Sequence, residues 1–332
     1  MAGEGNQKIL FSIPGKQHGN GTVHMAWQGD GNYLATVGSS RQAQVCDRYG
    51  QVVDDISLTA GGTVVAVDWD SDGETLAILQ QNNSALILWN ATTKASSMLE
   101  TNTKDLCWLQ WSKTGPELAV GSAKGNLVIH NKRTTRMVSL LGKHSRKITC
   151  GTWNKLNQLV LASEDKTVSV SSNQGEGIGS SIAVKGEPSD IQTQFQSGKK
   201  SNSFHVVGGK SIMLLDATDG EKPLEMAFLP KYGNVACHRW ISHDKMIVGF
   251  QSGYITILSM AAGTQGTQLL QRQASRGYIT ILSMAAGNQG TQLLERQVSK
   301  SPIATMATSL ECNRVAVVTD SSINFFDTLE VP

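Results

Sequence analysis

Long apolar runs are missing from this chain of 332 residues. A helix needs about 18 consecutive apolar residues to span a bilayer, and no run approaches that length. The first residues, MAGEGNQKILFSIPG, have neither a basic start nor an apolar core, so we expect no signal peptide. The formal net charge is only +2. Without a clustered excess of Lys and Arg, we expect no nucleic-acid partner.

Cysteine is scarce and has no metal-binding spacing. The chain has five cysteines, which are far apart and form neither a CxxC motif nor a Cys/His cluster. Four of them fall in predicted strands, where a small buried thiol is ordinary. This usage favours a reducing compartment on the cytoplasmic side. The five are Cys46, Cys107, Cys150, Cys237 and Cys312.

The common catalytic motifs are also absent. We find no GxGxxG after a strand, no P-loop, no HExxH and no GxSxG. Asp70-Ser71-Asp72-Gly73 resembles the start of a calcium loop, but Gln81 stands where the loop requires Glu. We interpret it as a turn between two strands. The sequence therefore predicts no catalytic, cofactor-binding or metal-binding residue, and it predicts that the chain is not an enzyme.

Aromatic residues make up only 6% of the chain, yet they are regularly spaced. Trp27, Trp69, Trp111 and Trp153 are separated by 42 residues each, and the next step of 42 reaches Phe195. The sequence around them also repeats, as in AWQGDGNYLA and DWDSDGETLA. A period of about 40 to 45 residues with several short strands is typical of WD-type β-propellers. We therefore predict an all-β fold.

Seven such units can be placed along the chain, and we predict that residues 1–332 form one seven-bladed propeller. Trp240 occupies the aromatic position of the sixth unit. The last unit lacks an outer strand, whereas the apolar segment near residues 8–13 has no unit of its own. We predict that this segment supplies the missing strand and closes the ring, which removes an open edge. The units begin near residues 22, 63, 105, 147, 189, 234 and 302.

The polar signature of WD repeats is incomplete. The fourth unit keeps His144, Ser163 and Asp165 of the usual hydrogen-bond network, but Ser171 stands where Trp is expected. Buried polar groups normally satisfy one another, so we interpret these residues as structural and not catalytic. Because the other units keep less of the signature, we expect apolar packing between blades to hold the fold.

A 24-residue segment occurs twice in the sixth unit, at 253–276 and 277–300. The copies differ at Thr264/Asn288, Gln271/Glu295 and Ala274/Val298. We interpret this as a tandem duplication of one hairpin, and a blade has room for one copy. The other copy is expected to extrude as a loop or to extend the outer edge of the blade. A role in recruiting a partner is the alternative to a duplication without a role.

Basic residues gather in the connections that a propeller places at one end of blades three to five. We predict that they form a docking face for an acidic protein segment or for anionic lipid headgroups. The alternative is a solvated surface partly balanced by Glu164 and Asp165. The run Lys132-Arg133-Arg136 should lie at the opposite end of the blades. The candidate docking residues are Lys124, Lys143, Arg146, Lys147, Lys166 and Lys210.

Several stretches are more specific than WD repeats in general. They include VCDRYGQ (45–51), VAVDWDSDGETLAIL (65–79), LQWSKTGPELAVGSAKGNLVIHNKRT (109–134), LLGKHSRKITCGTWN (140–154) and KYGNVACHRW (231–240). These stretches are similar to the N-terminal propeller of the intraflagellar transport complex A subunits numbered one-forty-four, the family of WD-repeat protein nineteen. The resemblance covers nearly the whole chain in order, is weakest in the fifth unit, and is interrupted by the duplicated segment.

This resemblance implies a non-enzymatic scaffold or docking propeller of complex A. It would act in retrograde ciliary transport and in the delivery of membrane cargo into cilia. Implied partners are other complex A subunits, tubby-like adaptors, membrane-protein cargo or an anionic membrane surface. The implied location is the cytoplasmic side of the cilium or flagellum and the basal body.

Two alternatives differ in class from the ciliary scaffold. A vesicle-coat propeller acting outside cilia would share most of these sequence features. A propeller hydrolase or lyase would need His and carboxylates at the starts of several inner strands. Only Asp105 provides an acid among five such starts, so the sequence gives an enzyme little support.

Overall fold

The computed structural model is built almost entirely of strands. Contacts divide the chain into two compact units: unit 1 is Met1–Glu100 with Ser275–Pro332, and unit 2 is Thr101–Ala274. Within the described part, no helix has the length and apolar character needed to cross a membrane. The structure describes residues 11–14, 17, 19, 23–40, 42–58, 62–193, 203–216, 224–242, 245–250, 254–260, 268–273, 278–282, 292–297, 303–309, 314–319 and 322–327.

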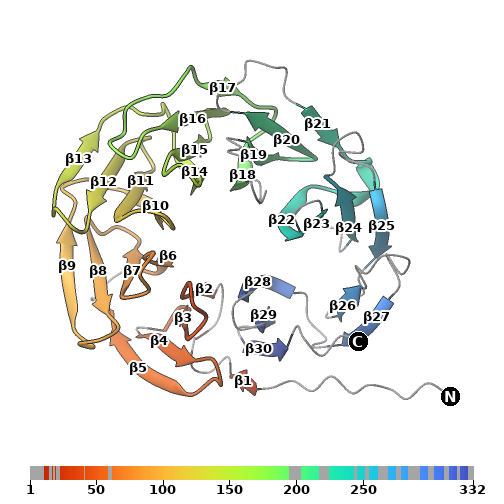
Figure 1. Cartoon of the computed structure of the whole chain (residues 1–332), viewed down its shortest axis with the longest axis horizontal. Coiled ribbons are helices and arrows are strands. Elements are labelled where there is room, and N and C mark those ends of the chain that lie inside the picture. Colours follow the sequence, from red (N-terminus) through yellow and green to blue (C-terminus); the bar gives the residue numbers. More distant parts are fainter. Residues whose placement is uncertain are drawn as a thin grey trace. The chain divides into compact units, whose positions relative to one another are not determined.

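Unit 2 contains four four-stranded antiparallel sheets in the described residues, each formed by four consecutive strands (Figure 1). A short 3-10 helix, η1 (Pro230–Tyr232), lies between the third and fourth sheets. The sheets are β10 (Leu106–Trp111), β11 (Glu117–Ser122), β12 (Leu127–Asn131) and β13 (Met137–Leu140); β14 (Ile148–Trp153), β15 (Leu159–Ser163), β16 (Thr167–Ser171) and β17 (Ile182–Ala183); β18 (Pro188–Thr193), β19 (Ser203–Gly208), β20 (Ser211–Asp216) and β21 (Leu224–Ala227); and β22 (Val235–Ser242), β23 (Lys245–Phe250), β24 (Tyr254–Ser259) and β25 (Gln268–Gln273).

Unit 1 contains three further four-stranded sheets and one two-stranded sheet among its described residues. Two of the four-stranded sheets are again formed by four consecutive strands, whereas the third combines the first strand with the last three. They are β2 (His24–Trp27), β3 (Tyr33–Val37), β4 (Gln42–Asp47) and β5 (Val52–Ser57); β6 (Val64–Trp69), β7 (Thr75–Gln80), β8 (Ala85–Asn90) and β9 (Ser96–Glu100); and β1 (Phe11–Ile13), β30 (Ser322–Asp327), β29 (Arg314–Thr319) and β28 (Ile303–Ser309). The two-stranded sheet is β26 (Tyr278–Leu282) with β27 (Gln292–Gln297).

Burial within a sheet falls from the middle strands to the outermost strand. Every residue of β7 and of β11 is buried, because these strands are covered on both faces. The outer strand β9 is almost wholly exposed. The apolar clusters join adjacent sheets, as where Trp69 and Trp89 pack with Val45 and Ile56 of the preceding sheet. The expected packing between blades is therefore present within each unit.

The regularly spaced tryptophans link successive inner strands. The indole Nε1 of Trp69 donates to the carbonyl oxygen of Ala26 at 3.0 Å, and that of Trp153 donates to Gln110 at 3.2 Å. Each acceptor immediately precedes the previous tryptophan of the series, so the 42-residue period positions each indole against the strand before it. Phe195 and the side chain of Trp240 lie outside the described residues.

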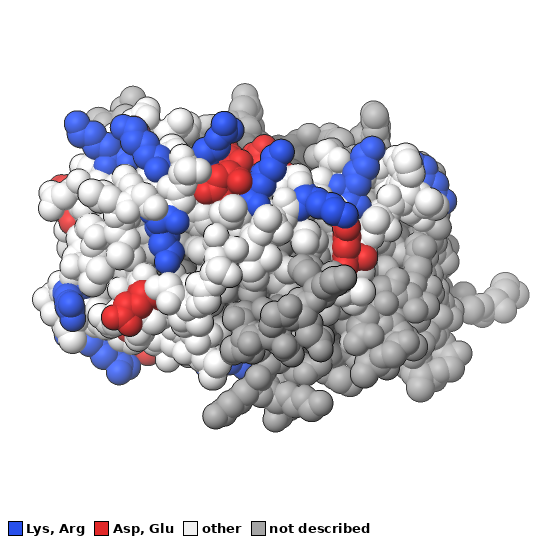
Figure 2. Space-filling view, turned by 90° about the horizontal axis from the view of Figure 1, so that it is seen from above, with Lys and Arg blue, Asp and Glu red and all other residues white. Residues whose placement is uncertain are grey.

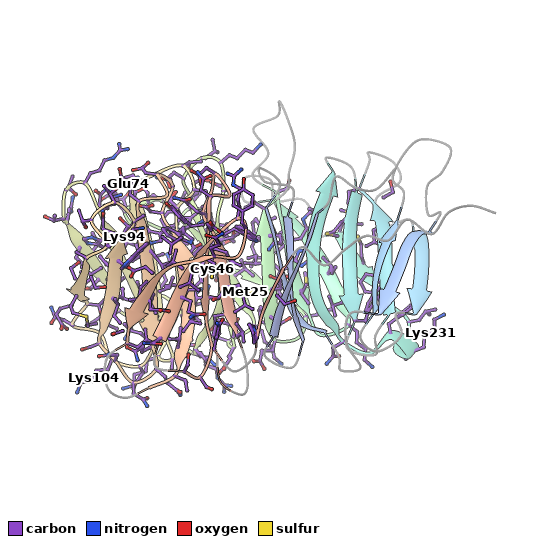
Figure 3. All side chains as sticks on the ribbon, turned by 90° about the horizontal axis from the view of Figure 1, so that it is seen from below. Met25, Cys46, Glu74, Lys94, Lys104 and Lys231 are labelled. Carbon is purple, nitrogen blue, oxygen red and sulfur yellow. The ribbon has the colours of Figure 1, made fainter. Side chains whose placement is uncertain are left out.

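The N-terminal strand completes the last sheet. Phe11 pairs with Phe325 and Ile13 with Ile323, so β1 is the fourth strand beside β30, as predicted. The rest of the predicted segment, residues 8–10, lies outside the described residues. Ile13 is 3% exposed and belongs to a small cluster with Val23 and other residues of the first sheet. That cluster includes Cys46, with Met25 packed against it; both are labelled in Figure 3.

The two copies of the duplicated segment form separate hairpins. The first copy provides β24 and β25, which complete the sheet begun by β22 and β23. The second copy forms the two-stranded sheet of β26 and β27. The second copy is thus an independent hairpin. The expected alternative, in which it extends the outer edge of the sheet, is wrong.

Candidate docking surface

The turns and connections at one end of unit 2 are joined by backbone hydrogen bonds. Three of the donors lie in turns or connections, and the fourth is the first residue of β22; every acceptor is a carbonyl of a neighbouring turn or connection. Three of these bonds join the β11–β12 turn, the β13–β14 connection, the β15–β16 turn and the β17–β18 connection into one row along this end, and the fourth joins the β19–β20 turn to β22. The bonds are His144 N to Gly125 O (3.0 Å), Glu164 N to Lys147 O (2.9 Å), Val184 N to Lys166 O (2.9 Å) and Val235 N to Gly209 O (2.9 Å).

Five of the six candidate docking residues lie in this row, and Lys210 lies in the β19–β20 turn at the same end of unit 2. The run Lys132-Arg133-Arg136 lies in the turn between β12 and β13, at the other end of β12 from Lys124. Figure 2 shows Lys and Arg side chains along one edge of the surface in view, with Asp and Glu side chains between several of them. Lys124 lies in the β11–β12 turn; Lys143, Arg146 and Lys147 in the β13–β14 connection; Lys166 in the β15–β16 turn; and Lys210 in the β19–β20 turn.

The six side chains differ in exposure and pairing. Lys124 is exposed and forms an ion pair with Asp105 at 3.2 Å. Arg146, Lys147 and Lys166 are exposed and form no ion pair within the described part of the chain. Lys143 is half-buried, and its Nζ lies 4.0 Å from the position that a Cβ on Gly177 would occupy. Burial lowers the pKa of this Lys143 ammonium.

His144 anchors the β13–β14 connection from beneath. Its side chain is buried, with Nδ1 at 3.1 Å from Asp165 Oδ2 and Nε2 at 2.9 Å from Ser169 Oγ. A carboxylate only accepts, so Nδ1 donates to Asp165 and Nε2 accepts from the Ser169 hydroxyl. The predicted contact between His144 and Asp165 is confirmed.

Ser163 belongs to this network through the backbone of Asp165 and not through the His144 ring. Ser163 Oγ donates to the carbonyl of Arg146 at 3.1 Å and accepts from the Asp165 amide at 3.1 Å, and it makes no hydrogen bond to His144 among the described contacts. Its place is taken by Ser169, with Thr167 beside Nδ1 at 3.1 Å. These two residues alternate along β16 and so share a face of the strand, a period-2 signal visible in the sequence.

The charges in this network are fixed near neutral pH. Burial lowers the pKa of His144, although Asp165 opposes that effect. Burial alone would raise the pKa of Asp165, but hydrogen bonds from Thr167 and Ser145 and the proximity of His144 lower it to about 2. The network therefore holds a neutral imidazole against an ionised carboxylate, an arrangement suited to positioning a loop.

Leu141 is an exposed residue in this loop that the sequence analysis did not single out. Its exposure is 82%. The next residue, Gly142, donates its backbone N–H to Asn126 Oδ1 at 3.0 Å, which holds this part of the loop against the β11–β12 turn. An apolar side chain thus stands beside the basic residues on a fixed piece of backbone.

The described residues contain no group of three His, Cys, Asp or Glu side chains arranged to hold a metal ion. The calcium-like sequence at Asp70 forms a turn, as interpreted from the sequence. Asp70 Oδ1 accepts the backbone N–H groups of Glu74 at 2.9 Å and Thr75 at 3.0 Å. These bonds close the turn between β6 and β7.

The antiparallel four-stranded sheets define a WD40-like β-propeller fold. The chain is similar to the crystal structure of Saccharomyces cerevisiae Sqt1, with a TM-score of 0.75 at 13% identity, over 94% of this chain and 96% of that one. This likeness concerns the fold alone. A family model for the first beta-propeller of WDR19 matches residues 23–276, so the chain belongs to the family of WDR19 first β-propellers.

Two curated WD-repeat proteins are similar to part of the chain. The chain is 35% identical to human WD repeat-containing protein 19 over 124 residues, which is 36% of this chain and 9% of that protein. It is 28% identical to WD repeat-containing protein dyf-2 of Caenorhabditis elegans over 116 residues, 34% of this chain and 8% of the relative. The matched region thus spans under a tenth of the length of either relative.

Proposed function

We propose that this chain is a non-enzymatic scaffold and docking propeller of intraflagellar transport complex A. It acts in retrograde ciliary transport and in the delivery of membrane cargo into cilia. The family match over residues 23–276 carries this proposal. The resemblance of LLGKHSRKITCGTWN and the other stretches to complex A subunits agrees with it.

In this proposal the seven four-stranded sheets are the blades of one ring over residues 1–332. The strand β1 closes the ring by joining the last blade to the first. The backbone pairing of β1 with β30 supports this closure, as does the packing of Ile13 with Val23, Leu34 and Cys46. A closed ring leaves no open sheet edge at the join, which limits aggregation.

The proposed partners are the other complex A subunits, with tubby-like adaptors, membrane-protein cargo or an anionic membrane as further candidates. The proposed location is the cytoplasmic side of the cilium or flagellum and its basal body. The family supplies no catalytic residues, and the buried His144 and its partner Asp165 are used in positioning a loop. A role in docking therefore suits this surface better than one in catalysis.

Affinity purification of the tagged chain from ciliated cells, followed by mass spectrometry, tests this function. We expect other complex A subunits to copurify. Recovery of vesicle-coat subunits instead would favour a trafficking propeller outside cilia. Recovery of neither, from a chain shown to be folded by circular dichroism, would contradict a complex A contact on this propeller.

A further inference from the structure

The loop between β13 and β14 is held rigidly at three points. Gly142 is bonded to Asn126, the His144 amide to Gly125, and the His144 ring to Asp165 and Ser169. At Gly125 the backbone has φ +77°, and a Cβ there would lie 2.1 Å from the carbonyl oxygen of His144. Turn and loop therefore lie in close backbone contact. A loop fixed before binding loses little conformational entropy when a partner docks.

This rigid loop presents one apolar side chain together with cations. Leu141 is 82% exposed, and Arg146 and Lys147 are exposed without an ion pair in the described part of the chain. Lys147 lies against the turn that carries Lys166, because Glu164 N donates to the Lys147 carbonyl at 2.9 Å. The surface thus offers one contact for an apolar side chain and several for carboxylates.

Acidic residues within the same surface indicate whether the partner is a protein segment or a membrane. Asp105 lies beside Lys124 at 3.2 Å, and Glu164 follows directly after β15. A broad anionic membrane would approach these carboxylates as well as the cations, and like charges repel. A narrow peptide can reach Arg146 and Lys147 while passing between the acidic residues. Charge complementarity at this scale favours an extended protein segment.

We propose that the loop of residues 141–147 docks an acidic segment of a partner protein, with Leu141 contacting an apolar side chain of that segment. Arg146, Lys147 and Lys166 contact its carboxylates. This inference rests on the proposed docking function and names the chemistry of its partner. Lys143, whose ammonium lies beside Gly177, is not part of the contact.

Fluorescence anisotropy with a labelled peptide of one Leu between two runs of Glu tests this proposal on the whole chain. Leu141→Ser should weaken binding about tenfold, as expected for losing most of a buried leucine contact. It should also abolish the preference for this peptide over a version with Ser in place of Leu. The double variant Arg146→Glu/Lys147→Glu should weaken binding of both peptides and flatten the dependence on salt.

Two matched controls lie at the other end of the same sheets. Leu156 is 44% exposed in the β14–β15 turn, and Arg133 and Arg136 lie between β12 and β13. Leu156→Ser and Arg133→Glu/Arg136→Glu should bind as the parent does. The proposal would be overturned if these controls lost as much affinity for the peptide as the Leu141 and Arg146/Lys147 variants do. It would also be overturned if the parent bound the Leu and Ser peptides equally well. Tighter binding to phosphatidylserine-containing vesicles through the same residues would replace it with a membrane contact.

The same variants separate this inference from the proposed function. Undiminished recovery of complex A subunits by Leu141→Ser and Arg146→Glu/Lys147→Glu would overturn the loop contact and leave the complex A role standing. Peptide binding as expected, without recovery of complex A subunits by the parent, would keep the docking site and overturn its ciliary setting.

The duplicated hairpin carries a second, independent inference. Strands β24 and β26 have the same sequence over their shared positions, and β25 and β27 differ only at Gln271 and Glu295. The pairing is also the same, since Tyr254 faces Gln273 as Tyr278 faces Gln297. Either hairpin therefore offers β23 the same strand to pair with.

The connections do not favour the first copy strongly. With β24 beside β23, the linkers are 251–253 and 274–302; with β26 beside β23 they become 251–277 and 298–302. Each arrangement thus has one short and one long linker. Loop-closure entropy grows only with the logarithm of length, so the two arrangements differ by about twofold in this term.

We infer that the two hairpins exchange in the sheet of β22 and β23, with comparable populations of both arrangements. Hydrogen exchange read by mass spectrometry tests this, because Gln271 and Glu295 give the copies different peptide masses. Amides of β24–β25 and β26–β27 should show protection that agrees within about tenfold. Protection of β24–β25 more than a hundredfold above that of β26–β27 would overturn the exchange.

Proline substitutions on the two copies provide a matched pair. Thr256 pairs with Gln271 and Thr280 pairs with Glu295 at the same place in each hairpin. Proline removes a backbone donor and disfavours a central strand position. Thr256→Pro should shift protection to β26–β27, and Thr280→Pro should shift it to β24–β25. A Thr256→Pro chain that loses protection in β22–β23 as well would contradict exchange.

Discussion

Tyr33 and Glu117 occupy the same place in two different sheets. Each is the first residue of the second strand, where Tyr33 pairs with Asp47 and Glu117 pairs with Asn131. Each also reaches the sheet that follows it in the same unit, and we call this contact between adjacent sheets a join. The first does so in unit 1 with an aromatic ring, and the second in unit 2 with a carboxylate.

The join in unit 1 is aromatic. The ring of Tyr33 stacks on Trp69 with centroids 6.4 Å apart, and Trp69 meets Trp89 edge-on at 5.9 Å. The ammonium of Lys94, labelled in Figure 3, lies 5.2 Å from the centroid of the Tyr33 ring and 4.8 Å from that of Trp89. Contacts of this kind combine apolar burial with cation–π attraction.

The join in unit 2 is polar. Glu117 is 3% exposed, and three side-chain amides donate to its carboxylate: Asn131 at 3.1 Å, Asn157 at 2.9 Å and Asn173 at 3.2 Å. Two of these donors belong to the next sheet or its turns. Lys94 and Asn173 both follow the third strand of the following sheet, so one topology accepts either chemistry at this place. The tryptophan-to-carbonyl bond is common to both joins.

The largest effect should come from the element that the joins share. Trp69→Ala and Trp153→Ala should each lower the free energy of unfolding by about 3 to 5 kcal/mol, because each removes a large buried side chain. Urea unfolding followed by circular dichroism measures this. A loss below about 1 kcal/mol in one variant alone would show that the tryptophan supports only one of the two joins.

Glu117→Ala should cost about 3 kcal/mol, because it leaves three partly buried amides without their acceptor. Glu117→Gln keeps an acceptor oxygen and should restore part of the loss. The same urea titration measures both variants. Glu117→Tyr would sharpen the comparison: full stability in that variant would mean that the aromatic chemistry of Tyr33 is accepted in unit 2 as well.

Asp165→Asn should cost about 2 kcal/mol near neutral pH, since the folded state lowers the pKa of Asp165 from 3.8 to about 2. A lowered pKa favours the ionised carboxylate in the folded state. Its contribution is therefore present above pH 4 and is lost as the pH falls toward 2. Urea unfolding between pH 7 and pH 3 should show the gap between parent and variant narrowing with acid. A gap that does not depend on pH would contradict this origin.

The smallest effects should come from the residues at the rims of the joins. Lys94→Met removes the cation over Tyr33 and Trp89 and should cost about 0.5 to 1 kcal/mol. Asn173→Ala removes one of three donors to Glu117 and should cost about 1 kcal/mol. Thermal unfolding at low and high salt compares them. Equal sensitivity to salt in the two variants would contradict the assignment of the cation–π contact to unit 1 only.

The periodic features were predictable because they recur at regular intervals along the sequence. The Trp spacing, the strand positions and the pairing of residues 11–13 with the last sheet follow from period and apolar alternation. The Glu117 join was not foreseen, because Asn157 and Asn173 lie 40 and 56 residues away.

The docking residues illustrate the same limit. Their placement at one end of unit 2 follows from strand order, which the sequence reveals. The course of the Lys143 side chain toward Gly177 does not, because it depends on an open space left by a residue 34 positions further along. Likewise, the contact of the His144 ring with Ser169 joins residues 25 positions apart.

The pairing of Phe11 with Phe325 has a consequence for synthesis. The two strands of that ladder are far apart in the sequence, so on a ribosome β1 emerges long before its partner β30. Until β30 has emerged, an apolar segment has no ladder to join, while the sheets between fold in order. The nascent chain must therefore keep this segment from other exposed edges, and a chaperone that binds short apolar strands would act at this point.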